Sequence, residues 1–151
     1  MKMRLRLYLD TSVVGAYMDD RLPERRQATL DFWARLGEYD VSVSELTVAE
    51  LRATGQGNVR QQMAELIKPF GVLRIGEEAR ALAQEYLRRG VFSAATFADA
   101  LHVAVAVTSR QDLLISWNFR HLVNRRRRAL VNEANILRGY PRIEILAPPE
   151  V

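Results

Sequence analysis

The chain has 151 residues, 48% of them hydrophobic and 26% charged, which is enough for one globular domain with its own core. It contains no cysteine, so disulfides, thiolate zinc sites and a cysteine nucleophile are excluded, and it has no apolar run long enough to cross a bilayer. Its net charge is +4, and no signal-peptide pattern precedes the first predicted strand. We therefore expect a single domain over residues 1–151, cytoplasmic and not bound to a membrane.

The first predicted strand covers residues 4–9, where Leu5, Leu7 and Leu9 alternate with other residues at a strand's period of two. It ends at Asp10, because aspartate is a poor strand former. At the carboxyl end of a first strand, an aspartate lies where open α/β sheets bind their ligands. The alternative is that Asp10 only begins a turn or caps the next helix.

Helices and strands then alternate as far as residue 89. A helix over residues 23–37 begins at a proline and ends at a glycine, and a strand over residues 41–44 follows it. Thr47 and Glu50 match a capping box at the start of the next helix, so capping is the alternative to a functional role for Glu50. Glycines near residues 55–57 break that helix. The remaining elements in this part are a helix over 58–68, a strand over 72–75 and a helix over 77–89.

The helix predicted over residues 96–107 is the most informative, because it is apolar nearly all round and should be buried. Asp99 lies in its first turn. A carboxylate on a buried helix is costly unless a cap or a metal compensates it, and Thr96 with Asp99 can be interpreted as such a cap. His102 lies one turn later on the same face, and we expect a hydrogen-bonded core residue there rather than a metal ligand.

The last part of the chain combines a buried strand with a strongly basic segment. A strand over residues 113–116 leads to Asn118, and a helix over 126–138, a strand over 143–146 and a loose tail with two prolines follow. Five arginines lie within nine residues that contain no acid, and they are Arg120, Arg125, Arg126, Arg127 and Arg128. Such a cluster can bind phosphates. The alternatives are a solvated helix face or a docking surface for an acidic partner.

Strands that alternate with helices predict an α/β fold, a three-layer α/β/α sandwich with a central parallel sheet. In such a sheet the first and fourth strands can end side by side, which would bring Asp10, Asn118, Glu50 and Asp99 to one edge. Clustered carboxylates repel one another unless a cation binds, and an all-oxygen set favours Mg²⁺ or Mn²⁺ over zinc. A metal held in this way can activate water for displacement at phosphorus, and the arginine cluster could hold a nucleic-acid backbone.

Four short motifs carry a resemblance to a known family. They run from Tyr8 to Val14, from Ser44 to Leu51, from Phe97 to His102 and from Leu114 to Asn118. In this order, and over nearly the whole chain, they resemble PIN-domain proteins, and among these the VapC-type toxins of bacterial and archaeal toxin–antitoxin pairs.

The resemblance implies a PIN-like sandwich and a metal-dependent endoribonuclease with Asp10, Glu50 and Asp99 as ligands of Mg²⁺ or Mn²⁺. Ser12 stands where relatives use a small polar residue to orient a water at the metal. Relatives usually have aspartate at the fourth position. Asn118 can coordinate through its carbonyl oxygen but brings no charge, so we expect a second cation to bind less well. The resemblance also implies an antitoxin and a second copy of the chain as partners.

Two other functions compete with the nuclease. In the first, the protein is a binding module: Asn118 marks a weakened site, and the arginine cluster binds RNA or an acidic protein without catalysis. In the second, Asp10 is the nucleophile of a phosphatase of the haloacid-dehalogenase type. Such an enzyme needs a second acid where Ser12 stands and a lysine near the site, and the two lysines, Lys2 and Lys68, lie at the start of a strand and the end of a helix.

Overall fold

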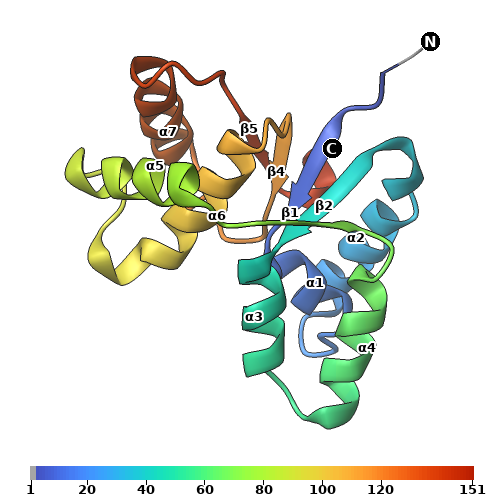
Figure 1. Cartoon of the computed structure of the whole chain (residues 1–151). Helices are drawn as coiled ribbons and strands as arrows, with labels where there is room; N and C mark the ends of the chain where they lie inside the picture. The colour runs from blue at the N-terminus through green and yellow to red at the C-terminus, as the bar shows by residue number, and fades with distance from the viewer. Residues whose placement is uncertain (1–2) are drawn as a thin grey trace.

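The computed structural model describes residues 3–151, and its strands form one parallel sheet in the order β3-β2-β1-β4-β5 (Figure 1). The start of the chain, including Lys2, lies outside the described residues. The strands are β1 (Arg6–Leu9), β2 (Asp40–Ser44), β3 (Gly71–Leu73), β4 (Leu113–Ile115) and β5 (Glu144–Leu146).

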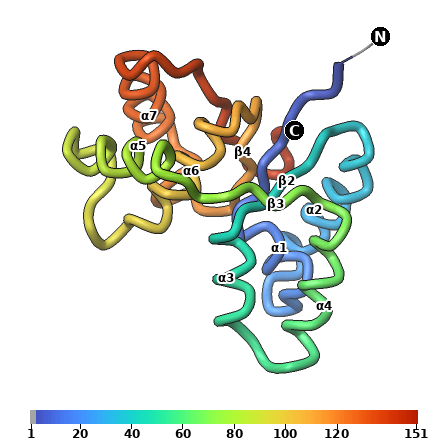
Figure 2. The backbone as a smooth tube through the Cα atoms, viewed as in Figure 1, coloured from blue at the N-terminus to red at the C-terminus, as the bar shows by residue number. Residues whose placement is uncertain are grey.

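Helices cover both faces of this sheet. Because crossovers between parallel strands are right-handed, the helices between β1 and β3 lie on one face and those between β3 and β5 on the other. Figure 2 shows these two groups apart from each other, with the sheet between them. The first group is α1 (Thr11–Tyr17), α2 (Pro23–Trp33), α3 (Glu45–Ala53) and α4 (Gly57–Ile67), and the second is α5 (Glu77–Arg88), α6 (Phe97–Thr108) and α7 (Arg125–Leu137). The predicted α/β/α sandwich is confirmed.

The central strand β1 is buried more completely than its alternating pattern predicted. Leu7, Tyr8 and Leu9 are all inaccessible to solvent, whereas Leu5 is exposed and precedes the strand. A central parallel strand is covered by helices on both faces, so consecutive residues enter the core. The helix α6 is buried from Ala100 to Val107, as predicted.

The order of the strands changes direction at β1: β2 and β3 follow on one side of it, and β4 and β5 follow on the other. These two strands pair in parallel, with Leu9 opposite Ile115, and the N–H of Asp10 donates to the carbonyl of Ile115 at 3.2 Å. Their carboxyl ends therefore lie side by side, as predicted. Ligands of open α/β sheets bind at such a switch point, so this edge is where a functional site is expected.

Both predicted capping boxes are wrong, so neither Glu50 nor Asp99 is a capping residue. Ser44 is the N-cap of α3, and its box partner is Thr47, so Glu50 lies one turn further along the helix. Thr96 instead closes a box with Ser93 in a short 3₁₀ helix, and it makes no side-chain cap bond to α6. Capping therefore explains neither Glu50 nor Asp99.

Other predicted boundaries shift as well. The helix α2 ends at Trp33, and Gly37 lies inside a 3₁₀ helix, η1 (Leu36–Glu38). The strand β3 ends at Leu73 instead of residue 75. The predicted loose tail is ordered: η3 (Pro148–Glu150) packs against α2, and Pro148 is buried. No helix within residues 3–151 is both long enough and apolar enough to cross a membrane.

Candidate functional site

Asp10 follows β1 at the carboxyl edge of the sheet, and only N–H and O–H groups hold its carboxylate. Oδ1 accepts hydrogen bonds from the N–H of Ser12 at 3.0 Å and from its hydroxyl at 2.5 Å, and Oδ2 accepts one from the Ser116 hydroxyl at 2.6 Å. The residue is only 4% exposed. Burial raises the pKa of Asp10 above its ordinary value, against the smaller opposing effects of His102 and these hydrogen bonds. The site thus contains a buried acid that a nearby cation would stabilise.

Two serines connect the ends of β1 and β4. The Ser12 hydroxyl donates to Asp10 and accepts from the N–H of Trp117 at 2.9 Å, and the Ser116 hydroxyl donates to Asp10 and accepts from the N–H of Asn118 at 2.9 Å. Ser12 was a predicted site residue, whereas sequence reasoning gave Ser116 no role. The available signal was a hydroxyl at the end of a buried strand, two residues before Asn118.

Asp99 and Asn118 meet beside Asp10. The Asn118 Nδ2 donates to Asp99 Oδ1 at 3.4 Å, and its Oδ1 accepts from the N–H of His121 at 2.9 Å. The amide thus faces Asp99 with its donor side, while its carbonyl oxygen is already engaged. Burial raises the pKa of Asp99, and the negative charge of Asp10 acts in the same direction.

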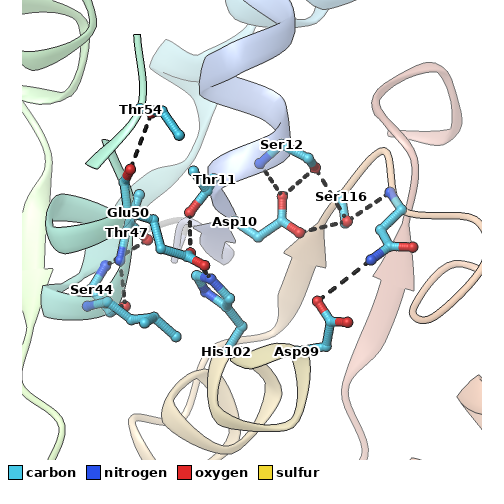
Figure 3. A network of polar contacts seen from close by, with 12 residues as sticks. Asp10, Thr11, Ser12, Ser44, Thr47, Glu50, Thr54, Asp99, His102 and Ser116 are labelled. Atoms are coloured by element: carbon cyan, nitrogen blue, oxygen red, sulfur yellow. Dashed lines mark hydrogen bonds and ion pairs between the residues drawn. The ribbon is translucent and has the colours of Figure 1, made fainter. Parts of the chain in front are cut away.

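Glu50 lies in α3, and Figure 3 shows Asp10 between it and Asp99 in this view. Glu50 Oε1 accepts from the Thr11 hydroxyl at 2.6 Å and lies 2.6 Å from His102 Nε2. Burial alone would raise the pKa of Glu50, but these hydrogen bonds bring it below its ordinary value, so the group is ionised at neutral pH. His102 is 3% exposed and hydrogen-bonded, as expected from the sequence.

The structure brings the four predicted side chains to one edge but does not close them into a cage. Within residues 3–151, no group of three or more His, Asp or Glu side chains lies close enough together to hold a metal ion. Mg²⁺, however, is commonly bound through one or two carboxylates together with water and substrate phosphate. Asp10 is buried and Asp99 is half-buried, and both have raised pKa values. Carboxylate oxygens suit Mg²⁺ and Mn²⁺. The donor set therefore fits such a cation.

The arginine cluster is divided between solvent and the protein. Arg120, Arg125 and Arg126 are exposed, whereas Arg128 forms an ion pair with Glu150 at 3.3 Å. Asn124 caps α7, so four consecutive arginines occupy the first positions of that helix. A helix N-terminus disfavours cations. Helix stability therefore does not explain the cluster.

Arg127 differs from the other members because it turns inward. Its guanidinium carbon lies 4.4 Å from the centroid of the buried Phe92 ring. Burial lowers the pKa of Arg127, and the negative charge of Asp99 opposes that effect. This arginine is therefore within electrostatic range of the acidic edge.

A groove of about 390 Å³ opens beside the acids. Thr11 and Ser12 line the part nearest to Asp10, and Arg21 and Arg25 lie along it. The opposite wall is formed by α3 and α4, with Leu51, Thr54, Gly55, Val59 and Met63. Asp19 also lines the groove and forms an ion pair with Arg21 at 2.9 Å. The groove therefore combines an apolar wall with the side chain of Arg25 and a paired Arg21.

Comparison with known proteins places this geometry in a family. A family model for the PIN domain matches residues 7–122. One similar structure is VapBC-1 from nontypeable Haemophilus influenzae, with 14% identity, a TM-score of 0.63 and coverage of 95% of this chain and 98% of that chain. Another is Mycobacterium tuberculosis VapC20, described as a sarcin-ricin loop cleaving toxin, with 19% identity, a TM-score of 0.59 and coverage of 76% and 92%.

A third structure is VapBC-5 from Mycobacterium tuberculosis, described as a member of the VapBC family of toxin–antitoxin systems. It has 20% identity, a TM-score of 0.52 and coverage of 94% of this chain and 98% of that chain. At these identities the likeness shows a shared fold. No curated protein sequence matches the chain.

Proposed function

The chain belongs to the PIN-domain family, and from that premise we propose that it is a Mg²⁺- or Mn²⁺-dependent endoribonuclease and the toxin of a toxin–antitoxin pair. In this proposal Asp10, Glu50 and Asp99 are the acidic ligands, and Asn118 and Ser12 complete the site. RNA is the substrate. The products are a 5′-phosphate and a 3′-hydroxyl.

The observation that carries the proposal is a buried carboxylate, Asp10, at the switch point between β1 and β4, with the half-buried carboxylate of Asp99 beside it. Burial raises the pKa of both Asp10 and Asp99. Among the residues that the structure describes, no arginine or lysine forms an ion pair with either. A divalent cation would supply the positive charge that these acids lack. When bound, it supplies Lewis-acid stabilisation of the charge that develops on a phosphodiester.

The side chains around the acids prepare them for this role. Ser12 and Ser116 donate to opposite oxygens of Asp10, so the carboxylate cannot rotate without breaking a hydrogen bond. Asn118 donates to one oxygen of Asp99. Such supporting contacts fix ligand orientation, which metal binding needs before substrate arrives.

Binding of RNA is supported by the arginines and by one exposed aromatic ring. Arg120, Arg125 and Arg126 reach solvent near the start of α7, where the helix dipole adds to their attraction for phosphate. Phe119 is 50% exposed and directly follows Asn118 in the chain. An exposed ring beside cationic groups suits stacking on an unpaired base, which favours a single-stranded segment as substrate.

The proposed antitoxin would occupy the groove between α1, α2, α3 and α4. The VapBC proteins with this fold carry the name of toxin–antitoxin systems. A groove with an apolar wall and the side chain of Arg25, beside the Arg21–Asp19 ion pair, suits an extended peptide with apolar side chains and an acidic group. We also propose a homodimer, whose mass can be measured by light scattering.

RNA cleavage by matched variants tests the proposed function. We expect the purified protein to cut RNA with Mg²⁺ or Mn²⁺, to stop when the metal is chelated, and to recover when Mn²⁺ is restored. Asp99→Asn should lose the activity. Asp31→Asn is the control, because Asp31 is exposed on α2 and its side chain accepts a hydrogen bond from Gln27 of the same helix. Metal-dependent cleavage by Asp99→Asn at the wild-type rate would refute the assignment.

A binding module is the second candidate, and Asn118 is the observation in its favour. Asn118 brings no charge to the acidic edge, and its carbonyl oxygen already accepts a hydrogen bond from the N–H of His121. The two functions differ in one experiment. A protein that binds RNA with a steep salt dependence, but cleaves none at any Mg²⁺ or Mn²⁺ concentration, is a binding module.

A further inference from the structure

A series of hydrogen-bonded side chains runs from Ser44 through Tyr8 and His102 to Glu50. Tyr8 is inaccessible to solvent, and its hydroxyl oxygen lies 2.6 Å from His102 Nδ1 and 2.8 Å from the Ser44 hydroxyl. The other nitrogen of His102, Nε2, lies 2.6 Å from Glu50 Oε1. His102 therefore bridges a core tyrosine and one of the proposed metal ligands.

The proton positions in this series follow from what each group can donate. Glu50 Oε1 also accepts from the Thr11 hydroxyl, and a carboxylate oxygen accepts, so His102 Nε2 carries the proton of its 2.6 Å hydrogen bond to Glu50. In the neutral imidazole Nδ1 must then accept, and the Tyr8 hydroxyl donates to it. The Ser44 oxygen accepts from two N–H groups at the start of α3, which leaves its own proton for the Tyr8 oxygen. All the hydrogen bonds thus run in one direction, toward Glu50.

This series ties together the three elements that carry the acids. Tyr8 lies in β1, two residues before Asp10. His102 lies in α6, one helical turn after Asp99, and Glu50 lies in α3. The contacts from His102 to Tyr8 and to Glu50 span 94 and 52 residues of sequence. His102 therefore links the Glu50 side chain to the helix that carries Asp99, as the Thr11 hydroxyl links it to the residue after Asp10.

We propose that His102, aligned by Tyr8, is a positioning residue that holds the Glu50 carboxylate in one orientation at the sheet edge that carries Asp10 and Asp99, where the proposed divalent cation binds. The His102 and Thr11 bonds both use Oε1, which leaves Oε2 for the cation. The inference rests on the proposed function and adds a residue that does not itself touch metal or RNA. Groups that orient metal ligands in this way tune metal affinity.

Calorimetric titration of Mn²⁺ into the full chain tests the inference with three variants. A glutamine amide reaches about as far as Nε2, so His102→Gln keeps a donor for Glu50. An asparagine amide reaches about as far as Nδ1, so His102→Asn keeps a partner for Tyr8 but not for Glu50. His102→Leu removes both contacts and keeps an apolar side chain in the core. Circular dichroism and thermal unfolding establish that each variant is folded.

We expect Mn²⁺ affinity to fall about 10- to 100-fold in His102→Asn and His102→Leu, the range found for groups that orient metal ligands, and His102→Gln to restore most of it. The inference is overturned if all three variants bind like wild type. It is also overturned if asparagine restores affinity and glutamine does not, or if all three lose it equally, because the effect would then not pass through the Glu50 contact.

Nitrogen NMR of the wild-type imidazoles supplies a measurement that needs no variant. We expect the His102 Nε2 resonance to shift during a Mg²⁺ titration with the same dissociation constant as calorimetry gives. An unchanged resonance at saturation overturns the inference and leaves the proposed function intact. A wild-type protein that binds neither Mn²⁺ nor Mg²⁺ overturns both.

Discussion

Replacing Asn118 with aspartate would test whether the acidic edge is organised around a cation. The Asn118 amide nitrogen now donates to Asp99 Oδ1 at 3.4 Å. An aspartate in the same place would exchange that donor for a second negative charge. Without a cation the two carboxylates repel each other, and with one they share it.

The cost of this substitution can be worked out from the distance. Two unit charges at that separation repel by ~1 kcal/mol in water and by ~5 kcal/mol at an effective dielectric constant of 20. Both residues are partly accessible to solvent. We therefore expect a loss of about 1–3 kcal/mol in the free energy of unfolding at pH 7, between these limits.

The pH dependence has a definite sign. Repulsion raises the folded-state pKa of the new acid and of Asp99, whose pKa is already raised by burial, above their unfolded values. When a carboxyl has a higher pKa in the folded state than in the unfolded state, its ionisation lowers the free energy of unfolding. The penalty should therefore be present at pH 7 and disappear as the pH falls below about 4, where both carboxyls are protonated.

Urea unfolding with and without Mn²⁺ measures the effect. We expect Mn²⁺ to cancel the loss in Asn118→Asp, because a cation at 100 times its dissociation constant adds about 2.7 kcal/mol to the folded state. Gln61→Glu is the control, since it adds the same charge at an exposed position of α4. A loss that responds to neither Mn²⁺ nor pH would refute the reasoning, because the two side chains would then not share a site.

Three further predictions test neighbouring contacts. Ser116→Ala leaves the N–H of Asn118 unpaired and removes a donor to Asp10, so we expect a loss of about 1–3 kcal/mol in urea unfolding together with weaker Mn²⁺ binding by calorimetry. Arg126→Ala should lower the slope of log affinity for RNA against log salt by about 1 in a filter-binding assay, and an unchanged slope contradicts a phosphate contact. Tyr86→Phe strands the buried amide oxygen of Asn135 and should cost about 1–3 kcal/mol in urea unfolding without changing the cleavage rate of the folded protein.

The sheet edge that carries the acids could be predicted from the sequence, because the signals for it are local. Asp10 ends a run of strand-forming residues, and Asn118 follows another such run. Asp99 stands out as an acid in an apolar helix. Each of these signals lies within a few residues, and the parallel arrangement then brings the ends of β1 and β4 together.

The contacts of the acids could not be predicted in the same way, because they join residues far apart in the chain. Glu50 matched a capping box with Thr47, but Ser44 offers the same hydroxyl one turn earlier and caps α3 instead. Local pattern does not decide between two hydroxyls that can both cap a helix. Nor could it identify the partner of His102, since the hydrogen bond to Glu50 spans 52 residues.

The charges at this edge suggest why an asparagine is tolerated there. Of the three acids, Asp10 and Asp99 have raised pKa values, whereas hydrogen bonds from His102 and Thr11 bring the pKa of Glu50 below its ordinary value. The Asp99 carboxylate accepts a hydrogen bond from the Asn118 amide. The Asn118 amide presents a partial positive charge to the Asp99 carboxylate and so stabilises its negative charge. Among four acids, a second cation would have to supply this stabilisation. We therefore expect the three acids to need one cation for balance, and the Asn118→Asp variant restores the condition in which a second one is required.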